Sequence, residues 1–364
     1  MEQQQKFFAR MYAHVKRHWI TISFILGFIS DNIVLHRIDQ ALTNTILATY
    51  TFLTMFSNIA LYAGISGRFS PRVNEVLKTY APLVMQFVFG GVLSGMLIFY
   101  SRSGSLVGSW PYLLLIIAVI FGNETIKNRG HRLVYNLSII FVGLFSYVEL
   151  VVPVIIGKMG DVVFIGSGML ALFIMSLFFK VLTFVVPNFI ALQKRNVVFT
   201  IGLIFVLFNT LYFTNLIPPI PLALKDSGVF HSVIRMGEDT YVLSYEKPAW
   251  WRFWKESDSR FHYAPGDNVY CYASVFAPTR LATDIYDRWE YYDETEKKWV
   301  EHGRYSYPIT GGREDGYRGY TQIANVHDGK WRCTIETPRG QILGRETFTI
   351  ISGVKQPLVT RTEQ

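Results

Sequence analysis

The stretch IPPIP, residues 217–221, divides the 364-residue chain into two parts of different character. Consecutive prolines remove backbone donors and disfavour helical geometry, so a helix that reaches residue 217 is expected to end there. Residues 1–221 hold 16 Lys and Arg against 7 Asp and Glu, whereas residues 222–364 hold 19 against 20. The net charge of +8 therefore comes from the first part, because the two parts carry +9 and −1.

Seven apolar runs precede this stretch, and each approaches the length of about 20 residues that a helix needs to cross a membrane. They lie at residues 19–35, 41–64, 81–100, 110–126, 133–156, 162–186 and 197–217. A buried helix of a soluble protein is the alternative for any single run. Seven runs in succession predict a polytopic helical membrane bundle over residues 19–221, after a basic N-terminal segment at 1–18.

The loops between the runs carry unequal positive charge on alternate sides. One side holds Lys6, Arg10, Lys16, Arg17, Arg68, Arg72, Lys78, Lys127, Arg129, Arg132, Lys194 and Arg195, and the other holds Arg37, Arg102 and Lys158. Cytoplasmic loops are enriched in Lys and Arg, so the N-terminus is expected in the cytoplasm. Seven spans then place residues 222–364 outside it. The positive charge is explained by topology, and no nucleic-acid partner is predicted.

Polar side chains inside the runs form two layers in this orientation. The outer layer holds Asp31, Asn32, Glu149 and Asn209, and the layer nearer the cytoplasm holds Asn58, Gln86, Asn123, Glu124 and Lys180. An ionisable group at mid-membrane costs roughly 2.5–3.5 kcal/mol, so each needs a partner or a function. Glu124 and Lys180 are expected to pair. The layers indicate either a polar cavity or ion path, or hydrogen bonds between helices and side chains that reach the headgroups.

Residues 222–364 show the short alternating runs that are typical of β-strands. Eight strands are predicted, at residues 229–236, 240–245, 268–276, 284–292, 304–309, 317–324, 330–336 and 342–351. Turn signals rich in Gly, Pro and Asp separate them. This pattern favours an all-β sandwich over residues 222–364.

Cys271 and Cys333 are the two cysteines of the chain, and both lie in predicted strands. A disulfide can form outside the cytoplasm. Trp289 follows Cys271 by one strand, which matches immunoglobulin domains, where a disulfide between sheets packs against a tryptophan. The residues predict an immunoglobulin-like sandwich with this bridge, and two free buried thiols are the alternative. Asp287 fits poorly, because strand alternation places it on the face of Trp289.

Familiar catalytic and metal-binding motifs are missing from the sequence. It contains no H-E-x-x-H, no G-x-S-x-G elbow and no phosphate-binding glycine loop, and the tail histidines lack metal-ligand spacing. No metal and no cofactor is therefore predicted. The aromatic and basic stretch WWRFW, residues 250–254, is compatible with contact to the bilayer surface, with sugar stacking or with packing beneath the sandwich.

Seven short motifs along the chain are similar to segments of one protein family. They are 275–278 (VFAP), 311–321 (GGREDGYRGYT), 329–332 (GKWR), 340–345 (GQILGR), 27–31 (GFISD), 86–90 (QFVFG) and 217–221 (IPPIP). The chain resembles a bacterial family of unknown function of the DUF2914 type, over nearly its whole length. The resemblance implies an inner-membrane protein of a Gram-negative envelope with this domain at its C-terminal end. It implies no activity.

Cationic and aromatic side chains gather in the glycine-flanked motif 311–321, at Arg313, Tyr317, Arg318 and Tyr320. Such a surface suits a carboxylate, a sugar or a peptide. Alternatively the tyrosines belong to the core, and the arginines bridge to acidic residues at 284, 287 or 290.

Three functions are compatible with these features. The first is an envelope protein without catalytic activity, anchored in the bilayer by its helices, whose periplasmic sandwich binds a partner protein or a glycan. The second is a transporter or channel that uses the buried polar residues of the bundle. The third is a membrane-embedded enzyme.

Overall fold

The computed structural model of the chain describes residues 28–35, 37–104, 106–125, 132–237, 240–247, 259–264, 266–353 and 356–363, without the side chains of 106, 107, 123–125 and 188. Contacts divide the chain into two compact units. The first, which we call the helical bundle, comprises Met1–Phe99, Pro111–Val152 and Asp161–Thr214, and the second, the β-domain, comprises Tyr100–Trp110, Pro153–Gly160 and Asn215–Gln364.

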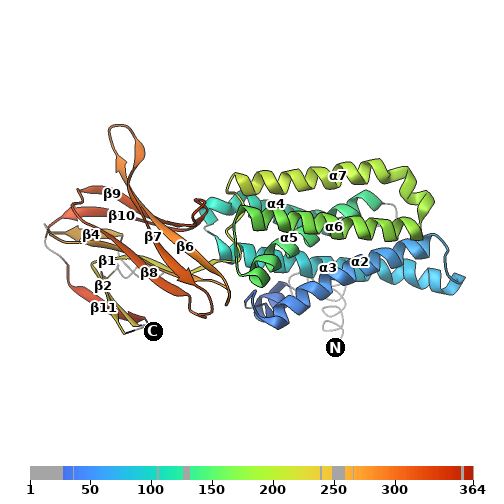
Figure 1. Cartoon of the computed structure of the whole chain (residues 1–364), viewed down its shortest axis with the longest axis horizontal. Coiled ribbons are helices and arrows are strands. Elements are labelled where there is room, and N and C mark those ends of the chain that lie inside the picture. Colours follow the sequence, from blue (N-terminus) through green and yellow to red (C-terminus); the bar gives the residue numbers. More distant parts are fainter. Residues whose placement is uncertain are drawn as a thin grey trace, which may run out of the picture. The chain divides into compact units, whose positions relative to one another are not determined.

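Six long helices lie side by side in the first half of the chain and follow a helical segment at residues 28–34 (Figure 1). They are α2 (Ala41–Ile65), α3 (Pro71–Ser103), α4 (Leu106–Thr125), α5 (Leu133–Ile156), α6 (Asp161–Val185) and α7 (Pro187–Phe213). Within the described residues, α2, α3, α5, α6 and the Phe189–Phe213 part of α7 are long and apolar enough to cross a membrane. The prediction of an apolar helical half is confirmed, and these helices indicate a membrane protein.

The predicted runs and the helices differ most clearly at α3. This helix begins ten residues before the run 81–100, because its first turns are polar but compatible with a helix. Helix α4 is 20 residues long, and Gly108–Gly122 is the apolar part whose side chains the structure describes. Hydropathy shows which residues suit lipid and does not show where a helix begins. The run 19–35 lies mostly outside the described residues.

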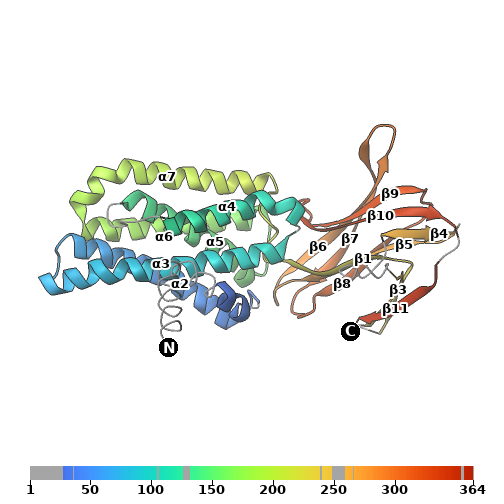
Figure 2. The same cartoon turned by 180° about the vertical axis from the view of Figure 1, so that it is seen from behind.

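The β-domain contains three sheets in the part of the chain that the structure describes (Figure 2). The first has the order β1 (Ala223–Phe230), β5 (Val269–Phe276), β8 (Tyr317–Ile323); the second has β4 (Arg260–Tyr263), β10 (Ile342–Ser352), β9 (Gly329–Glu336), β6 (Ala282–Asp293), β7 (Lys298–Thr310); the third has β11 (Leu358–Glu363), β3 (Thr240–Glu246), β2 (Ser232–Met236). Strands β4 and β10 are parallel, and the other neighbours are antiparallel. The prediction of a β-rich second half is confirmed.

The core of the β-domain lies between the first two sheets and is joined by a disulfide. Cys271 on β5 bonds to Cys333 on β9, and both are fully buried. Trp289 on β6 pairs in register with Cys333, so its ring lies beside the bridge. Trp289 and Trp331 are both fully buried in the same apolar cluster. Alternation along β6 and β9 thus sends one set of side chains into this core and the other set to the opposite face.

Two of the short sequence motifs meet at a turn around Gly311. The N–H of Gly311 donates to the carbonyl oxygen of Leu281 at 2.8 Å, and the N–H of Gly312 donates to that of Ala277 at 3.2 Å. A Cβ atom at Gly311 would lie 1.7 Å from the carbonyl oxygen of Pro278. Only glycine fits such a close approach of two backbones, and this accounts for the glycine at position 311.

Candidate functional site

A row of arginines crosses the face of the second sheet that points away from the core. On β9, the core side chain Cys333 alternates with Thr334, which therefore points outward. Thr334 pairs with Arg288 on β6 and with Arg345 on β10, and Arg288 pairs in turn with Arg304 on β7. Three guanidinium groups and one hydroxyl thus lie in one line across four strands that are about 4.8 Å apart.

Two glutamates flank this row and neutralise part of its charge. Glu336 accepts a hydrogen bond from Nε of Arg304 at 2.8 Å and pairs with Arg288 at 3.1 Å. Glu290 accepts two hydrogen bonds from Arg332, at 2.6 and 2.8 Å. Burial opposes ionisation of Glu290, but the hydrogen bonds from Arg332 and the charges of Arg288, Arg332 and Arg345 lower its pKa. The carboxylate of Glu290 is therefore held as an anion within the sheet face.

We call Arg288, Arg304, Arg332 and Arg345, with Glu290 and Glu336, the arginine face. Four arginines and two glutamates leave an excess of two positive charges. Aromatic rings hold two of the guanidinium groups: Arg304 lies 4.1 Å from the ring centre of Tyr286 and Arg332 lies 4.2 Å from that of Trp299. Such stacking fixes the orientation of a planar guanidinium group.

Arg345 uses little of its hydrogen-bonding capacity. Its Nε donates to Oγ1 of Thr334 at 3.2 Å, and its terminal nitrogens have no protein acceptor among the described residues. Burial and the charges of Arg332 and Arg288 lower the pKa of Arg345, against the opposing effect of Glu290 and Glu336. An anion placed there would relieve this repulsion and accept two parallel N–H bonds.

A buried carboxylate lies on the core side of the same sheet. Asp287 is fully buried and accepts a hydrogen bond from Oγ1 of Thr321 at 2.9 Å, while Nε1 of Trp289 donates to that hydroxyl at 3.0 Å. One of its oxygens and the sulfur atoms of Cys271 and Cys333 lie within 4.8 Å of one another. Burial raises the pKa of Asp287 to about 7; the Thr321 hydrogen bond opposes this, and the charge of Glu336 adds to it.

Comparison with known proteins assigns this part of the chain to a family. Residues 282–350 match the family described as "Protein of unknown function (DUF2914)". Residues 282–350 form a DUF2914 domain. All six residues of the arginine face lie inside the DUF2914 domain, and so do Asp287, Trp289 and Cys333. Cys271 precedes it.

No curated protein matches the chain. Among solved structures, it is similar to Pseudomonas fluorescens alkylpurine DNA glycosylase AlkC bound to DNA containing an abasic site analog. The two sequences are 10% identical, the alignment covers 84% of this chain and 82% of that one, and the TM-score is 0.18. A TM-score this low supports no inference about fold or function.

The ligand surface predicted at Arg313, Tyr317, Arg318 and Tyr320 is not continuous. Its residues lie on two faces of β8 and in the turn before it. Arg318 is buried, and its carbonyl oxygen accepts a hydrogen bond from Tyr241 at 3.3 Å. Tyr317 packs against the core, and Arg313 lies 5.3 Å from its ring centre. Tyr320 is exposed. The four residues therefore do not form one continuous exposed surface.

The outer polar residues of the helical bundle lie on the helical segment 28–34, on α5 and on α7. Asp31 is half-buried and lies near the hydroxyls of Ser94 and Tyr50. Glu149 is buried on α5. Asn209 donates to the carbonyl oxygen of Phe205, one turn earlier on its own helix, at 2.8 Å, and Asn32 is exposed.

The inner polar residues include one predicted pair that the described residues do not test. Lys180 is exposed on α6, whereas the side chains of Asn123 and Glu124 lie outside the described part, so the expected Glu124–Lys180 pair stays a prediction. Residues 250–254 lie outside it too. Gln86 is half-buried, and Asn58 is fully buried on α2 without a hydrogen-bond partner among the described residues.

Sequence reasoning missed two groups of polar residues. Asn136 on α5 is fully buried and donates to the hydroxyl of Tyr62 at 3.1 Å, a contact 74 residues apart in sequence. The arginine face was missed because its members come from four strands. The sequence did indicate that Arg332 and Glu336 point outward, because they alternate with Trp331 and Cys333 along one strand. It did not indicate the register of β6, β7 and β10, which brings the other members to the same place.

Proposed function

We propose that the chain is an inner-membrane protein of a bacterial envelope whose periplasmic β-domain binds an anionic glycan at the arginine face, without catalysis. The observation that carries the proposal is Arg345, whose terminal nitrogens are unused beside Arg288 and Arg332 in a face with two excess positive charges. An extended polymer with repeated carboxylates or phosphates suits guanidinium groups that lie in a row across neighbouring strands. The helical bundle serves as its anchor.

The proposal includes an immunoglobulin-like sandwich for the β-domain, over residues 222–364. It is supported by the disulfide between strands of two sheets and by Trp289 in register with Cys333. The strand order supports it too, because β6, β9 and β10 are neighbours as the C, F and G strands of such domains are.

The topology is part of the proposal and predicts the behaviour of fused reporters. Alkaline phosphatase, which is active only outside the cytoplasm, should be active when it is fused after Gln364. The same enzyme inserted in the loop 127–132 should be inactive, and green fluorescent protein at this position should fluoresce. The positive charge of the loops is the physical reason. The reverse pattern of activity would show that the β-domain, with its arginine face, lies in the cytoplasm.

Glycan binding is tested by Arg345→Gln in the full-length protein, reconstituted in nanodiscs of phosphatidylcholine. We expect its affinity for fluorescently labelled polygalacturonate to fall about tenfold or more, because a charge-assisted hydrogen bond contributes about 1.5–3 kcal/mol. Fluorescence anisotropy at several salt concentrations gives the affinity. Arg313→Gln is the matched control, since it removes the same charge from the other candidate surface, and it should bind as the wild type does.

Three results would contradict this assignment. Equal binding of neutral dextran would show that charge is not recognised. Equal losses in Arg345→Gln and Arg313→Gln would show only a general effect of net charge. Tighter binding of polyglutamate than of polygalacturonate would favour an acidic protein as the partner instead of a glycan.

A further inference from the structure

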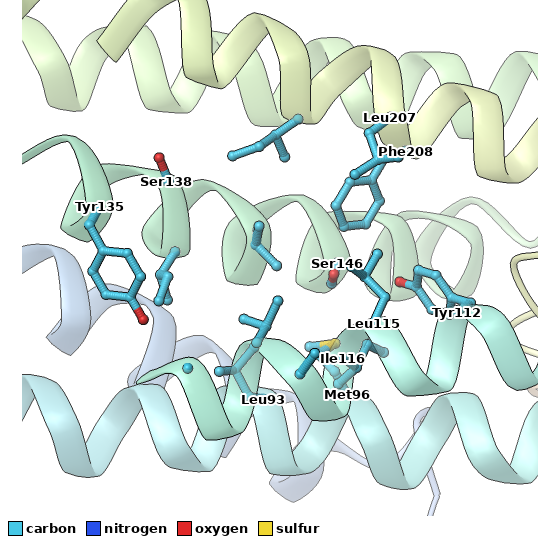
Figure 3. Close-up of a pocket in the computed structure, with 16 residues that line it drawn as sticks. Leu93, Met96, Tyr112, Leu115, Ile116, Tyr135, Ser138, Ser146, Leu207 and Phe208 are labelled. Carbon is cyan, nitrogen blue, oxygen red and sulfur yellow. The ribbon is translucent and has the colours of Figure 1, made fainter. Parts of the chain in front are cut away.

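An elongated cavity of about 380 Å³ lies inside the helical bundle between α3, α4, α5 and α7 (Figure 3). Tyr135 on α5 lies at one end and Tyr112 on α4 at the other, while Leu207 and Phe208 on α7 face Leu93 and Met96 on α3 across it (Figure 3). The volume falls within the range of about 300–1,000 Å³ that is usual for ligand sites. Its length favours a chain-like ligand over a compact one.

The chemistry of the lining excludes a charged ligand group. Aliphatic and aromatic side chains make up nearly all of it, and the polar atoms come from the hydroxyls of Tyr112, Tyr135, Ser138 and Ser146. The hydroxyl of Ser138 donates to the carbonyl oxygen of Val134 at 2.7 Å and is therefore already used. No charged side chain is among the described residues that line the cavity. An ion or a headgroup inside it would lose its hydration without compensation.

The cavity reaches the outer surface of the bundle between α4 and α7. Ala118 on α4 and Leu207 on α7 line it and are also exposed. Both helices are apolar on this side, where Leu114 and Leu203 are also exposed. The medium that meets such a surface in a membrane protein is lipid hydrocarbon and not water.

We propose that this cavity holds one acyl chain of a bilayer phospholipid, which enters between α4 and α7. An empty apolar cavity forfeits dispersion contacts along its walls, and a hydrocarbon chain restores them. Phospholipid is the hydrocarbon present at the opening in the greatest amount. The headgroup stays outside, at the membrane surface, as the uncharged lining requires. The site does not depend on the arginine face, so either assignment can fail without the other.

Gly122 provides a direct test, because it lines the cavity and a Cβ atom there would meet no other atom within 4 Å. The full-length protein is purified in mild detergent, washed extensively and examined by native mass spectrometry. The wild type should retain one phospholipid per chain, and Gly122→Phe, which fills the cavity, should reduce that occupancy at least tenfold. Gly202→Phe on α7 is the matched control: its Cβ atom also meets nothing within 4 Å, and it should retain the lipid.

A second measurement uses the unaltered protein, in case Gly122→Phe does not fold. A phospholipid with a diazirine near the end of its acyl chain is reconstituted with the wild type and photolysed. Peptides from 112–122 and 204–208 should carry the adducts, above peptides that contain the exposed residues Phe173 and Phe184 of α6. Even labelling of all lipid-facing helices, a wild type that retains no phospholipid, or retention of a lipid other than phospholipid would each overturn the proposal.

Discussion

Replacing Cys271 and Cys333 together by alanine should lower the free energy of unfolding of the β-domain by about 4 kcal/mol. The bridge closes a loop with a sequence separation of 62 residues, and the chain-entropy estimate for a loop of this length is about 4 kcal/mol. Loss of the buried sulfur atoms adds to this effect, because both positions are fully buried in the core. Urea unfolding of the full-length protein, followed by hydrogen exchange in peptides of β6 and β9, measures it.

Val275→Ala is the matched control for this experiment. Val275 is fully buried on β5, on the same side as Cys271, and its truncation removes core contacts without removing a cross-link. Reductant should therefore destabilise the wild type and Val275→Ala by similar amounts and leave the double alanine variant unchanged. If maleimide labels both thiols of the native, unreduced protein, the bridge is absent and this reasoning fails.

Asp287→Asn should remove a pH dependence of stability that the wild type shows between about pH 4 and pH 7. Burial raises the pKa of Asp287 to about 7 in the folded protein, whereas an unfolded aspartate titrates near 3.9. Between these values the folded state holds a proton that the unfolded state has lost. The stability that Asp287 contributes is thus complete below about pH 4 and is lost as the pH rises through about 7.

The size of this effect follows from the shift in pKa. Three units correspond to a loss on the order of 4 kcal/mol at pH 8, since each unit is worth about 1.36 kcal/mol. Asparagine cannot ionise and still offers an oxygen to the hydroxyl of Thr321, so the variant should exceed the wild type at pH 8 and not at pH 4. Urea unfolding at pH 4, 5, 6, 7 and 8 gives the difference.

Asp284→Asn on the same strand is the control, because Asp284 is exposed. It should follow the wild type at every pH. If Asp287→Asn and the wild type lose stability in parallel as the pH rises, the carboxylate is already ionised in the folded protein at low pH, and its buried environment is more polar than the structure indicates.

The sequence predicted features that depend on one continuous segment, such as a helix or the face of a strand. It did not predict which segments lie beside one another. Hydropathy located the apolar helices because the apolar residues of each one follow one another in the sequence. Alternation placed Asp287 on the face of Trp289, which is where it lies, but the compensating hydroxyl of Thr321 comes from another strand. The arginine face depends likewise on the register of four strands. Arg288 and Arg345 are 57 positions apart, and no local pattern indicates that one threonine separates them.

The predicted number of strands was wrong for a similar reason. One predicted strand, 229–236, contains the end of β1 and all of β2, and the chain changes sheets at His231. His231 forms a hydrogen bond with Glu246 at 3.0 Å, and Glu246 also bonds to His262 on β4 at 2.7 Å. The link between β1 and β2 and the strands β3 and β4, which belong to different sheets, meet at this carboxylate. Such a meeting point interrupts a strand without any glycine or proline to mark it.

The disulfide has a consequence for how this kind of domain can be inherited. One of its cysteines lies inside the segment 282–350 and the other lies 11 residues before that segment begins. Strands β1 and β5, which cover Trp289 and Trp331, also precede it. A recombination event that transferred residues 282–350 alone would deliver an unpaired thiol and two uncovered indole rings. A gene fusion that transferred this segment would therefore have to carry the upstream strands with it, and a cysteine in β5 would be the mark of a complete transfer.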